Sequence, residues 1–135
     1  YCLCHLKQIA VDLVHLLNQK RQVIIRVLAR HDIRGERELD QTGVWVGGAK
    51  VAAIGLNATR WITSHGFALN VCPNLAEFEE IVPCGIQGRP VTRLCDLIPP
   101  GSLEDVDSTS AAHIVRSQVV EEFADVFRVE VEVED

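Results

Sequence analysis

Cys84 is the residue whose surroundings best suit covalent chemistry. It lies in the stretch IVPCGIQG, between Pro83 and Gly85, at the end of an apolar run. A thiol that serves only for packing would sit better in the middle of such a run, and a neighbouring glycine lets another group approach closely. The position predicts a reactive cysteine nucleophile, with a small buried hydrophobic side chain as the alternative.

Lys50 is the candidate cation that would activate this thiol. A cysteine nucleophile reacts as the thiolate, so a nearby positive charge is needed to lower the pKa of the sulfur. Lys50 follows the Gly47-Gly48 pair and opens the apolar run VAAIGL. A lysine at the mouth of a strand can extend into a pocket while its stem packs on apolar neighbours. An ion pair with Cys84 is therefore predicted, with an ordinary solvated lysine as the alternative.

A second group of residues is compatible with substrate binding. His65 could orient a carbonyl group or simply form a hydrogen bond in the core. Gly66 beside it leaves backbone N–H groups accessible, as an oxyanion site requires. Ala53, Ile54 and Gly55 suit the wall of a tunnel for an acyl chain, and they suit the interior of any strand equally well.

The cysteines do not predict a metal site. Cys2, Cys4 and His5 form a C-x-C-H string, but the sequence lacks a second ligand pair at a suitable distance. Motifs for a phosphate-binding loop, a zinc protease or a serine hydrolase elbow are also missing from the sequence. Free thiols in a reducing compartment are expected for all five cysteines, which are Cys2, Cys4, Cys72, Cys84 and Cys95.

Length and charge limit the classes of function. A chain of 135 residues is long enough for one domain with a substantial core. The net charge of −6 argues against a nucleic-acid partner, because phosphate binding requires clustered Lys and Arg. No apolar stretch approaches the roughly 18 residues that span a bilayer, so no membrane partner is expected.

Hydrophobic periodicity predicts an α+β domain built around one sheet. Apolar residues recur at helical spacing from Leu6 to about Arg30 and from Ala111 to Phe127. Two β-prone runs, Val44–Val46 and Val51–Leu56, flank Gly47-Gly48 as in a hairpin. The pattern from Thr59 to Val71 indicates one or two further strands.

The remaining segments are expected to be irregular or short. Residues 31–43 and 96–110 are polar or rich in Pro, Gly and Ser, so both are predicted to be loops. Asn74 could cap a short helical turn. The alternating tail, residues 128–135, is either an edge strand with one acidic face or an acidic tail without regular structure.

Two motifs carry a resemblance to a known family. The stretch TGVWVGGAKVAAIGLNATRWITSHGFALNV, followed by IVPCGI, closely resembles the lipoyl(octanoyl) transferases, the octanoyltransferases of lipoic acid synthesis. The resemblance is dense over Thr42–Ile86 and looser in the preceding helix. It implies the fold of the biotin and lipoate protein ligases, a mixed β-sheet with packed helices.

The resemblance also implies a reaction. An octanoyl group would pass from octanoyl-acyl carrier protein to Cys84 as a thioester, and then to a lysine of a lipoyl domain. Acceptors would be the lipoyl domains of 2-oxoacid dehydrogenases and the glycine cleavage H protein. Lys50 would lower the pKa of Cys84 and move protons. No cofactor would be needed, since the thioester arrives activated. The segments that would contact substrate are Ala53, Ile54, Gly55, His65, Gly66, Phe67 and Ala68.

Two departures from the family pattern keep alternatives open. The family carries an R-G-G…H-G-P-G-Q segment ahead of its first long helix, so residues 1–135 are expected to be a single catalytic domain truncated at its N-terminus. Arg93 lies where family members often have T-S-L. The alternatives are an inactive member that binds carrier or lipoyl domains without turnover, and an ATP-dependent lipoate or biotin ligase of the same fold.

The resemblance also bears on location and docking. A mitochondrial location is expected, with a plastid or the bacterial cytoplasm as the alternatives, and the protein is expected to be a monomer. Acyl carrier proteins and lipoyl domains are typically acidic, so Arg60, Arg89 and Arg93 are candidates for a docking rim, with solvated arginines as the alternative.

Overall fold

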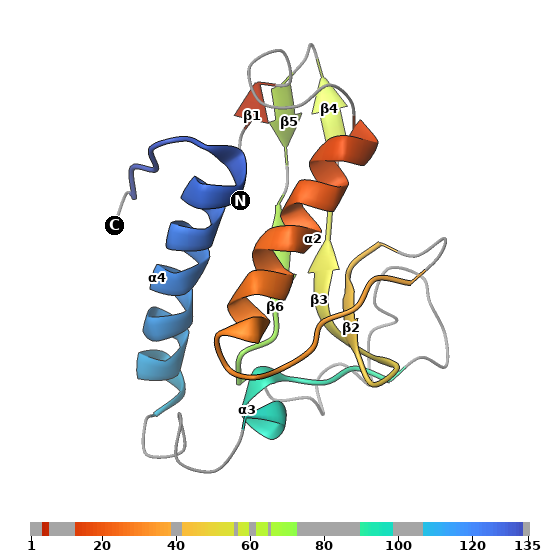
Figure 1. Ribbon diagram of the computed structural model, residues 1–135, viewed down its shortest axis with the longest axis vertical. Coiled ribbons are helices and arrows are strands. Elements are labelled where there is room, and N and C mark those ends of the chain that lie inside the picture. The colour runs from red at the N-terminus through yellow and green to blue at the C-terminus, as the bar shows by residue number, and fades with distance from the viewer. Residues whose placement is uncertain are drawn as a thin grey trace.

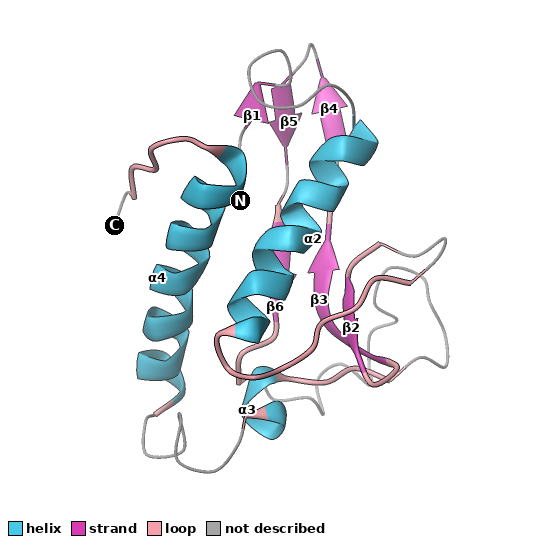
Figure 2. Ribbon diagram, in the orientation of Figure 1, coloured by secondary structure: helices cyan, strands magenta, loops and turns pink. Residues whose placement is uncertain are grey.

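The computed structural model describes residues 4–5, 13–38, 42–55, 57–59, 62–64, 66–72, 90–98 and 107–133. These ranges contain helices and strands packed together, which confirms the predicted α+β class. In chain order the elements are β1 (Cys4–His5), α2 (Leu13–Ala29), β2 (Val44–Val46), β3 (Ala49–Ile54), β4 (Asn57–Thr59), β5 (Ile62–Ser64), β6 (Phe67–Leu69), α3 (Leu94–Leu97) and α4 (Ser108–Phe127) (Figures 1 and 2).

The strands form two small sheets, whereas the sequence predicted one, and α2 packs on β2 and β3. One sheet has the order β2-β3-β6 and the other has the order β1-β5-β4, and every pair of these strands is antiparallel. A parallel bridge joins Lys50 to Val91, so the pairing around β3 is mixed. In Figure 1, α2 crosses the strands and α4 runs alongside α2. No helix in the described part of the chain is both long and apolar enough to cross a bilayer.

The predicted hairpin is confirmed, and its turn fixes the position of Lys50. Gly47 and Gly48 have φ values of 57° and 82°, as the two central residues of a type I′ turn require. This turn places Trp45 of β2 opposite Lys50 of β3. The strand begins at Ala49 rather than Val51, because a two-residue turn leaves only Gly47 and Gly48 outside the ladder.

The prediction of one or two further strands between Thr59 and Val71 is confirmed. The end of β4, all of β5 and all of β6 fall in this interval. The consecutive strands β5 and β6 belong to different sheets, and buried Gly66 lies where the chain passes from one to the other. The N–H group of Gly55 donates to the carbonyl of Gly66 at 2.8 Å, a close backbone approach of the kind that glycine permits.

The first predicted helix is confirmed over Leu13–Ala29, and residues 6–12 lie outside the described ranges. The helix ends in a Schellman motif. The N–H of Ile33 donates to the carbonyl of Leu28 at 3.0 Å, and Asp32 adopts a φ of 59°. Ile33 and Leu28 are both part of the hydrophobic core, so the motif also turns the chain back toward the sheet.

The second predicted helix is confirmed, but it starts earlier than expected. Asp107 caps α4 by accepting hydrogen bonds from the N–H groups of Thr109 and Ser110. These bonds, with one from the Ser110 hydroxyl, lower the pKa of Asp107. The prediction of a loop over residues 96–110 was wrong at both ends, since α3 contains residues 96 and 97 and α4 begins at Ser108. Ser108, Thr109 and Ser110 have the composition of a loop. The preceding Asp107 caps them, so they form the first turn of the helix.

The tail is not an edge strand in its described part, residues 128–133. Arg128 adopts a left-handed conformation with φ 55°, and its N–H group donates to the carbonyl of Ala124. Val129 donates to the same carbonyl at 3.1 Å. These bonds end the helix and turn the following residues away from it before they can pair with a strand.

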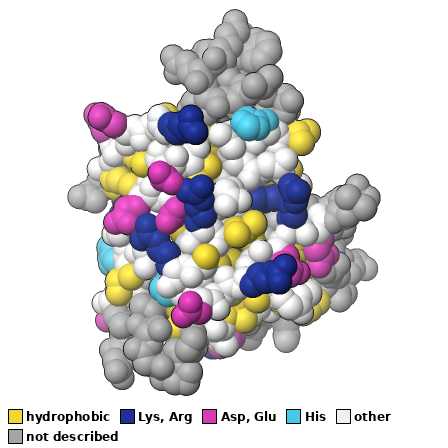
Figure 3. Space-filling model, viewed as in Figure 1, with side chains coloured by type: hydrophobic (Ala, Val, Ile, Leu, Met, Phe, Trp, Pro, Cys, Tyr) yellow, Lys and Arg dark blue, Asp and Glu magenta, His cyan; other side chains and the backbone are white. Residues whose placement is uncertain are grey.

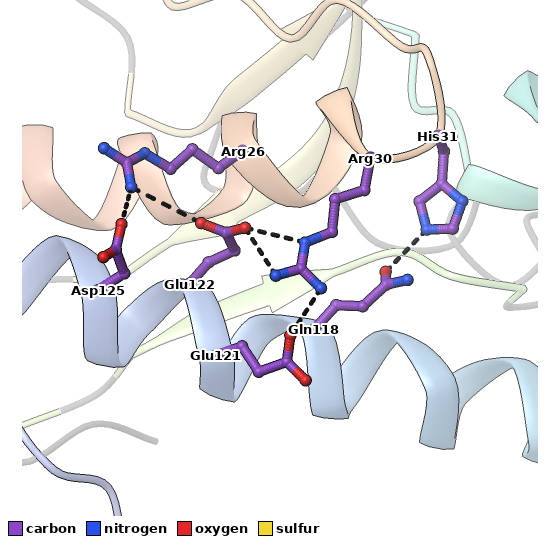
Figure 4. Close-up of polar contacts among 7 residues, drawn as sticks. All are labelled: Arg26, Arg30, His31, Gln118, Glu121, Glu122 and Asp125. Atoms are coloured by element: carbon purple, nitrogen blue, oxygen red, sulfur yellow. Dashed lines mark hydrogen bonds and ion pairs between the residues drawn. The ribbon is translucent and has the colours of Figure 1, made fainter.

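Ion pairs join α2 to α4 along their exposed sides (Figure 4). Arg30 lies 2.9 Å from Glu121 and 2.8 Å from Glu122, and Arg26 pairs with Asp125. The hydrogen bonds to Glu121 and Glu122 raise the pKa of Arg30. Exposed pairs of this kind add little to stability, about 0–1 kcal/mol each. Apolar contacts beneath the ion pairs hold the two helices together. The ion pairs help to set the position of one helix relative to the other.

Candidate functional site

Lys50 is buried on β3, and its amine has no hydrogen-bond partner among the described residues. The residue is only 4% exposed. Its Nζ lies 5.8 Å from the ring centroid of Trp45, which the hairpin places opposite it. A buried polar group usually carries a hydrogen bond, because desolvation without one is costly. The alternative of a solvated surface lysine is therefore wrong, since the side chain of Lys50 is held inside the protein.

The chain that follows Cys84 pairs with the backbone of Lys50. The N–H of Lys50 donates to the carbonyl of Pro90 at 2.9 Å, and the N–H of Thr92 donates to the carbonyl of Lys50 at 2.9 Å. This segment lies beside β3 past the point where β6 has ended, and the side-chain amide of Asn70 donates to the carbonyl of Thr92. Cys84 itself lies outside the described residues. The pairing nonetheless brings the chain that follows it to the strand of Lys50.

A disulfide closes the stretch that contains Cys84. Cys72 follows β6 and Cys95 lies in α3, with Cα atoms 5.5 Å apart. Backbone bonds align the two segments, since Leu94 donates to Asn70 at 2.8 Å and Cys95 donates to Val71 at 3.0 Å. The expectation of free thiols is therefore wrong for this pair. Sequence spacing could not show it, because the two cysteines meet only through the packing of α3 on the end of β6.

Replacing Cys95 with serine is expected to lower the free energy of unfolding by about 3 kcal/mol under oxidising conditions. The bridge joins residues that are 23 apart in sequence, so it restricts the unfolded chain. Urea unfolding with and without dithiothreitol measures the effect. Reductant should lower the stability of the wild type and leave the variant unchanged, and an equal response of both proteins would show that the bridge contributes nothing.

The segments expected to contact substrate lie side by side. Ala53 pairs with Ala68 and Ile54 pairs with Phe67 in the β3–β6 ladder. Gly55 and Gly66 continue this contact through their backbone hydrogen bond. Ala53 is about 10 Å along β3 from Lys50, at the usual rise per residue. Six of the seven predicted residues thus lie together at this end of the β3–β6 ladder, with the Ala53–Ala68 and Ile54–Phe67 pairs on opposite faces of the sheet, and His65 lies outside the described ranges.

The remaining predicted residues have mixed outcomes. Arg93 donates to Asp96 at 3.0 Å, so part of its charge is already engaged within the protein. Arg60, Arg89 and Cys2 lie outside the described residues. Cys4 and His5 form β1 and pair with Thr63 and Ile62, so they are components of a sheet.

Gly43 is a site residue that sequence reasoning placed in a loop. Its φ is +111°, and a Cβ built on it would lie 3.0 Å from Cε of Lys50 and 2.6 Å from the carbonyl oxygen of Ala52. The residue therefore provides the space in which the lysine stem lies. The only sequence signal was a glycine directly before a strand, and a glycine at such a position can equally mark a bulge or a bend.

Comparisons with known proteins place these features in a family. Residues 1–116 match the model of the lipoyl protein ligase A/B catalytic domain. An octanoyltransferase of Nostoc sp. is 48% identical over 130 residues, which cover 96% of this chain and 55% of that protein. An octanoyltransferase of Gloeobacter violaceus is 50% identical over 105 residues, covering 78% of this chain and 47% of that protein. These relatives confirm the resemblance, and this chain spans about half their length.

Solved structures confirm the fold. A lipoate-protein ligase A bound with ATP superposes with a TM-score of 0.69 at 12% identity, covering 91% of this chain and 49% of that one. Biotin protein ligase from Aquifex aeolicus gives a TM-score of 0.60 at 15% identity, covering 95% of this chain and 52% of that one. At such low identity the likeness concerns the fold alone. The similar octanoyltransferases are cyanobacterial, so the expected mitochondrial location finds no support in them.

Proposed function

Because this chain belongs to the family of lipoyl protein ligase A/B catalytic domains, we propose that it supplies the catalytic pair of an octanoyltransferase. The buried amine of Lys50 is the observation that carries the proposal. It has no hydrogen-bond partner among the described residues, and the chain that follows Cys84 pairs with its backbone. A thiolate from the neighbouring stretch is a suitable partner for such a group.

The reaction has two steps. The Cys84 thiolate attacks the carbonyl carbon of octanoyl-acyl carrier protein, the bond to the carrier sulfur breaks, and that sulfur takes a proton. The amine of a lysine on a lipoyl domain then attacks the Cys84 thioester. An amide forms, the amine loses its proton, and Cys84 leaves as a thiolate. Lys50 stabilises the thiolate in both steps and exchanges protons with the sulfur and the incoming amine.

The paired segments of β3 and β6 hold the acyl chain in this proposal. Ala53 and Ala68 lie opposite each other on one face of the ladder, where two small side chains leave room for an acyl chain. Ile54 and Phe67 lie on the other face and pack into the hydrophobic core, which supports this wall from behind. Burial of an octanoyl chain contributes about 0.8 kcal/mol per methylene group. Acceptors are lipoyl domains, including those of 2-oxoacid dehydrogenases and the glycine cleavage H protein.

Intact-mass spectrometry of the chain with octanoyl-acyl carrier protein tests the proposal. We expect a mass gain of one octanoyl group, released by hydroxylamine and absent in Cys84→Ser. Adding a lipoyl domain without ATP should transfer the group to it. Transfer that requires ATP would instead indicate a ligase, and no adduct on folded protein would indicate a member that binds carriers without turnover.

A further inference from the structure

A cleft of about 530 Å³ opens beside α2. It lies toward β2, at the opposite edge of the β2-β3-β6 sheet from β6. Asn18 and Arg21 of α2 form one wall, and residues 34–37 form the other. The second wall is attached to the sheet, because Glu36 and Trp45 exchange two backbone hydrogen bonds of 2.7 Å each. The cleft is therefore built between a helix and a segment with a fixed position.

Two guanidinium groups converge on one uncharged oxygen in this cleft. Nη1 of Arg21 donates to Oδ1 of Asn18 at 3.1 Å, and Nη1 of Arg37 donates to the same atom at 3.3 Å. Nε of Arg21 donates to the carbonyl of Gly43 at 3.2 Å. Burial and the nearby charge of Arg37 lower the pKa of Arg21. Holding two like charges this close has an electrostatic cost, which an anion between them would offset.

The lining carries more positive than negative charge. Arg34 is the third arginine of the cleft, and it pairs at 3.5 Å with Glu36, the carboxylate of the same wall. This local balance contrasts with the net charge of −6 on the whole chain. Figure 3 shows Lys and Arg side chains spread over the face of the molecule that α2 crosses, with Asp and Glu side chains between them. The excess of positive charge is therefore local to the cleft, and it favours an anionic ligand there.

The cleft adjoins the candidate catalytic lysine. Arg21 holds the carbonyl of Gly43, and Gly43 in turn lies against the stem of Lys50. Gly43 and Arg21 thus separate the cleft from the stem of Lys50, so a ligand with its anion in the cleft would need a long arm to bring its reactive end to the lysine. In the proposed function such a ligand is the donor, whose acyl group is a thioester at the end of a long arm attached through a phosphodiester.

We propose that Arg21 and Arg37 bind the phosphate of this prosthetic arm. The choice of ligand rests on the proposed function, whereas the anion site itself rests on the cleft. Arginine is suited to the task because its planar fork can present two N–H groups to phosphate oxygens. The Asn18 oxygen holds both forks in place before the ligand arrives, which reduces the entropy lost on binding.

Calorimetric titration of the full chain with 4′-phosphopantetheine and with pantetheine tests the proposal without requiring turnover. Wild type should bind 4′-phosphopantetheine, the phosphorylated arm, at least about tenfold more tightly than it binds pantetheine. Arg37→Ala should weaken binding of the phosphorylated arm by about tenfold and leave pantetheine binding unchanged. Arg37 is exposed, so the variant should fold normally. Arg128→Asn removes the same charge elsewhere and suits the left-handed backbone at that position, so it should bind like wild type.

Several results would overturn the proposal. Wild type contradicts the proposal if it binds 4′-phosphopantetheine and pantetheine with equal affinity, or if it binds neither measurably. So does an Arg37→Ala variant that binds both ligands more weakly by the same factor. Carrier protein without its arm is a further ligand to titrate. If Arg37→Ala weakens its binding as much as that of the phosphorylated arm, the cleft contacts carboxylates of the carrier instead. Phosphate-dependent binding in a chain that forms no adduct on Cys84 would support the cleft and contradict the proposed function.

Discussion

Replacing Lys50 with methionine is expected to slow octanoyl transfer by about a thousandfold while the protein stays folded. Methionine loses the contact of Nζ with the Trp45 ring, but it keeps much of the length and apolar character of the lysine stem, and its sulfur can pack against an aromatic ring. It removes the amine that has no hydrogen-bond partner among the described residues. The free energy of unfolding should be no lower than in wild type, because an amine no longer has to be desolvated.

The pH dependence of Cys84 alkylation separates an electrostatic role of Lys50 from a structural one. A positive charge near a thiol favours the thiolate and lowers the pKa of the sulfur. The rate of alkylation by iodoacetamide increases as the thiol loses its proton. In Lys50→Met this increase should therefore occur at a higher pH than in wild type. An unchanged profile, together with a large loss of transfer, would show that Lys50 does not act on the thiol.

Lys20→Met is the matched control for this experiment. Lys20 is fully buried on α2, and its Nζ also lacks a hydrogen-bond partner among the described residues. It lies in the middle of the apolar face of the helix, four residues after Leu16 and three before Val23. The variant should keep wild-type transfer and alkylation. A loss equal to that of Lys50→Met would mean that any buried amine has this effect, and the assignment of Lys50 would fail.

Local signals in the sequence were sufficient for several elements. Gly47-Gly48 predicted the hairpin because two positive φ values in succession are nearly specific to such turns. Hydrophobic periodicity located α2 and α4, since each helix buries one face. The position of Lys50 followed from the turn, because a two-residue loop fixes which residues face each other.

Features that depend on distant contacts could not be predicted in the same way. The division of β5 and β6 between two sheets depends on which strand each one pairs with, and the composition of a three-residue strand does not identify its partner. The Cys72–Cys95 bridge and the convergence of Arg21 and Arg37 on Asn18 require the packed structure. Residue types alone made Ala53, Ile54, Gly55, His65 and Gly66 candidates for substrate binding, and the resemblance added Phe67 and Ala68. The β3–β6 register, which brings the two segments together, depends on distant pairing.

Gly43→Ala is expected to lower the free energy of unfolding by about 4 kcal/mol, from strain at positive φ and from overpacking. The added Cβ would lie 2.6 Å from the carbonyl oxygen of Ala52, which belongs to the backbone of β3 and cannot easily move. It would also lie 3.0 Å from Cε of Lys50 and push that side chain aside. A displacement of about 1 Å can cost on the order of a hundredfold in rate, so transfer by the folded fraction should also fall.

Gly47→Ala shows how much of this loss comes from backbone conformation alone. Gly47 also has positive φ, at 57°, but nothing lies within 4 Å of a Cβ built there. Its replacement should cost only about 1 kcal/mol and leave octanoyl transfer unchanged. Denaturant unfolding and transfer assays on both variants measure the difference. If the two alanines cost the same, Gly43 is a turn residue like Gly47. A much larger cost at Gly43, with slower transfer, would mean that this glycine maintains the space in which Lys50 acts.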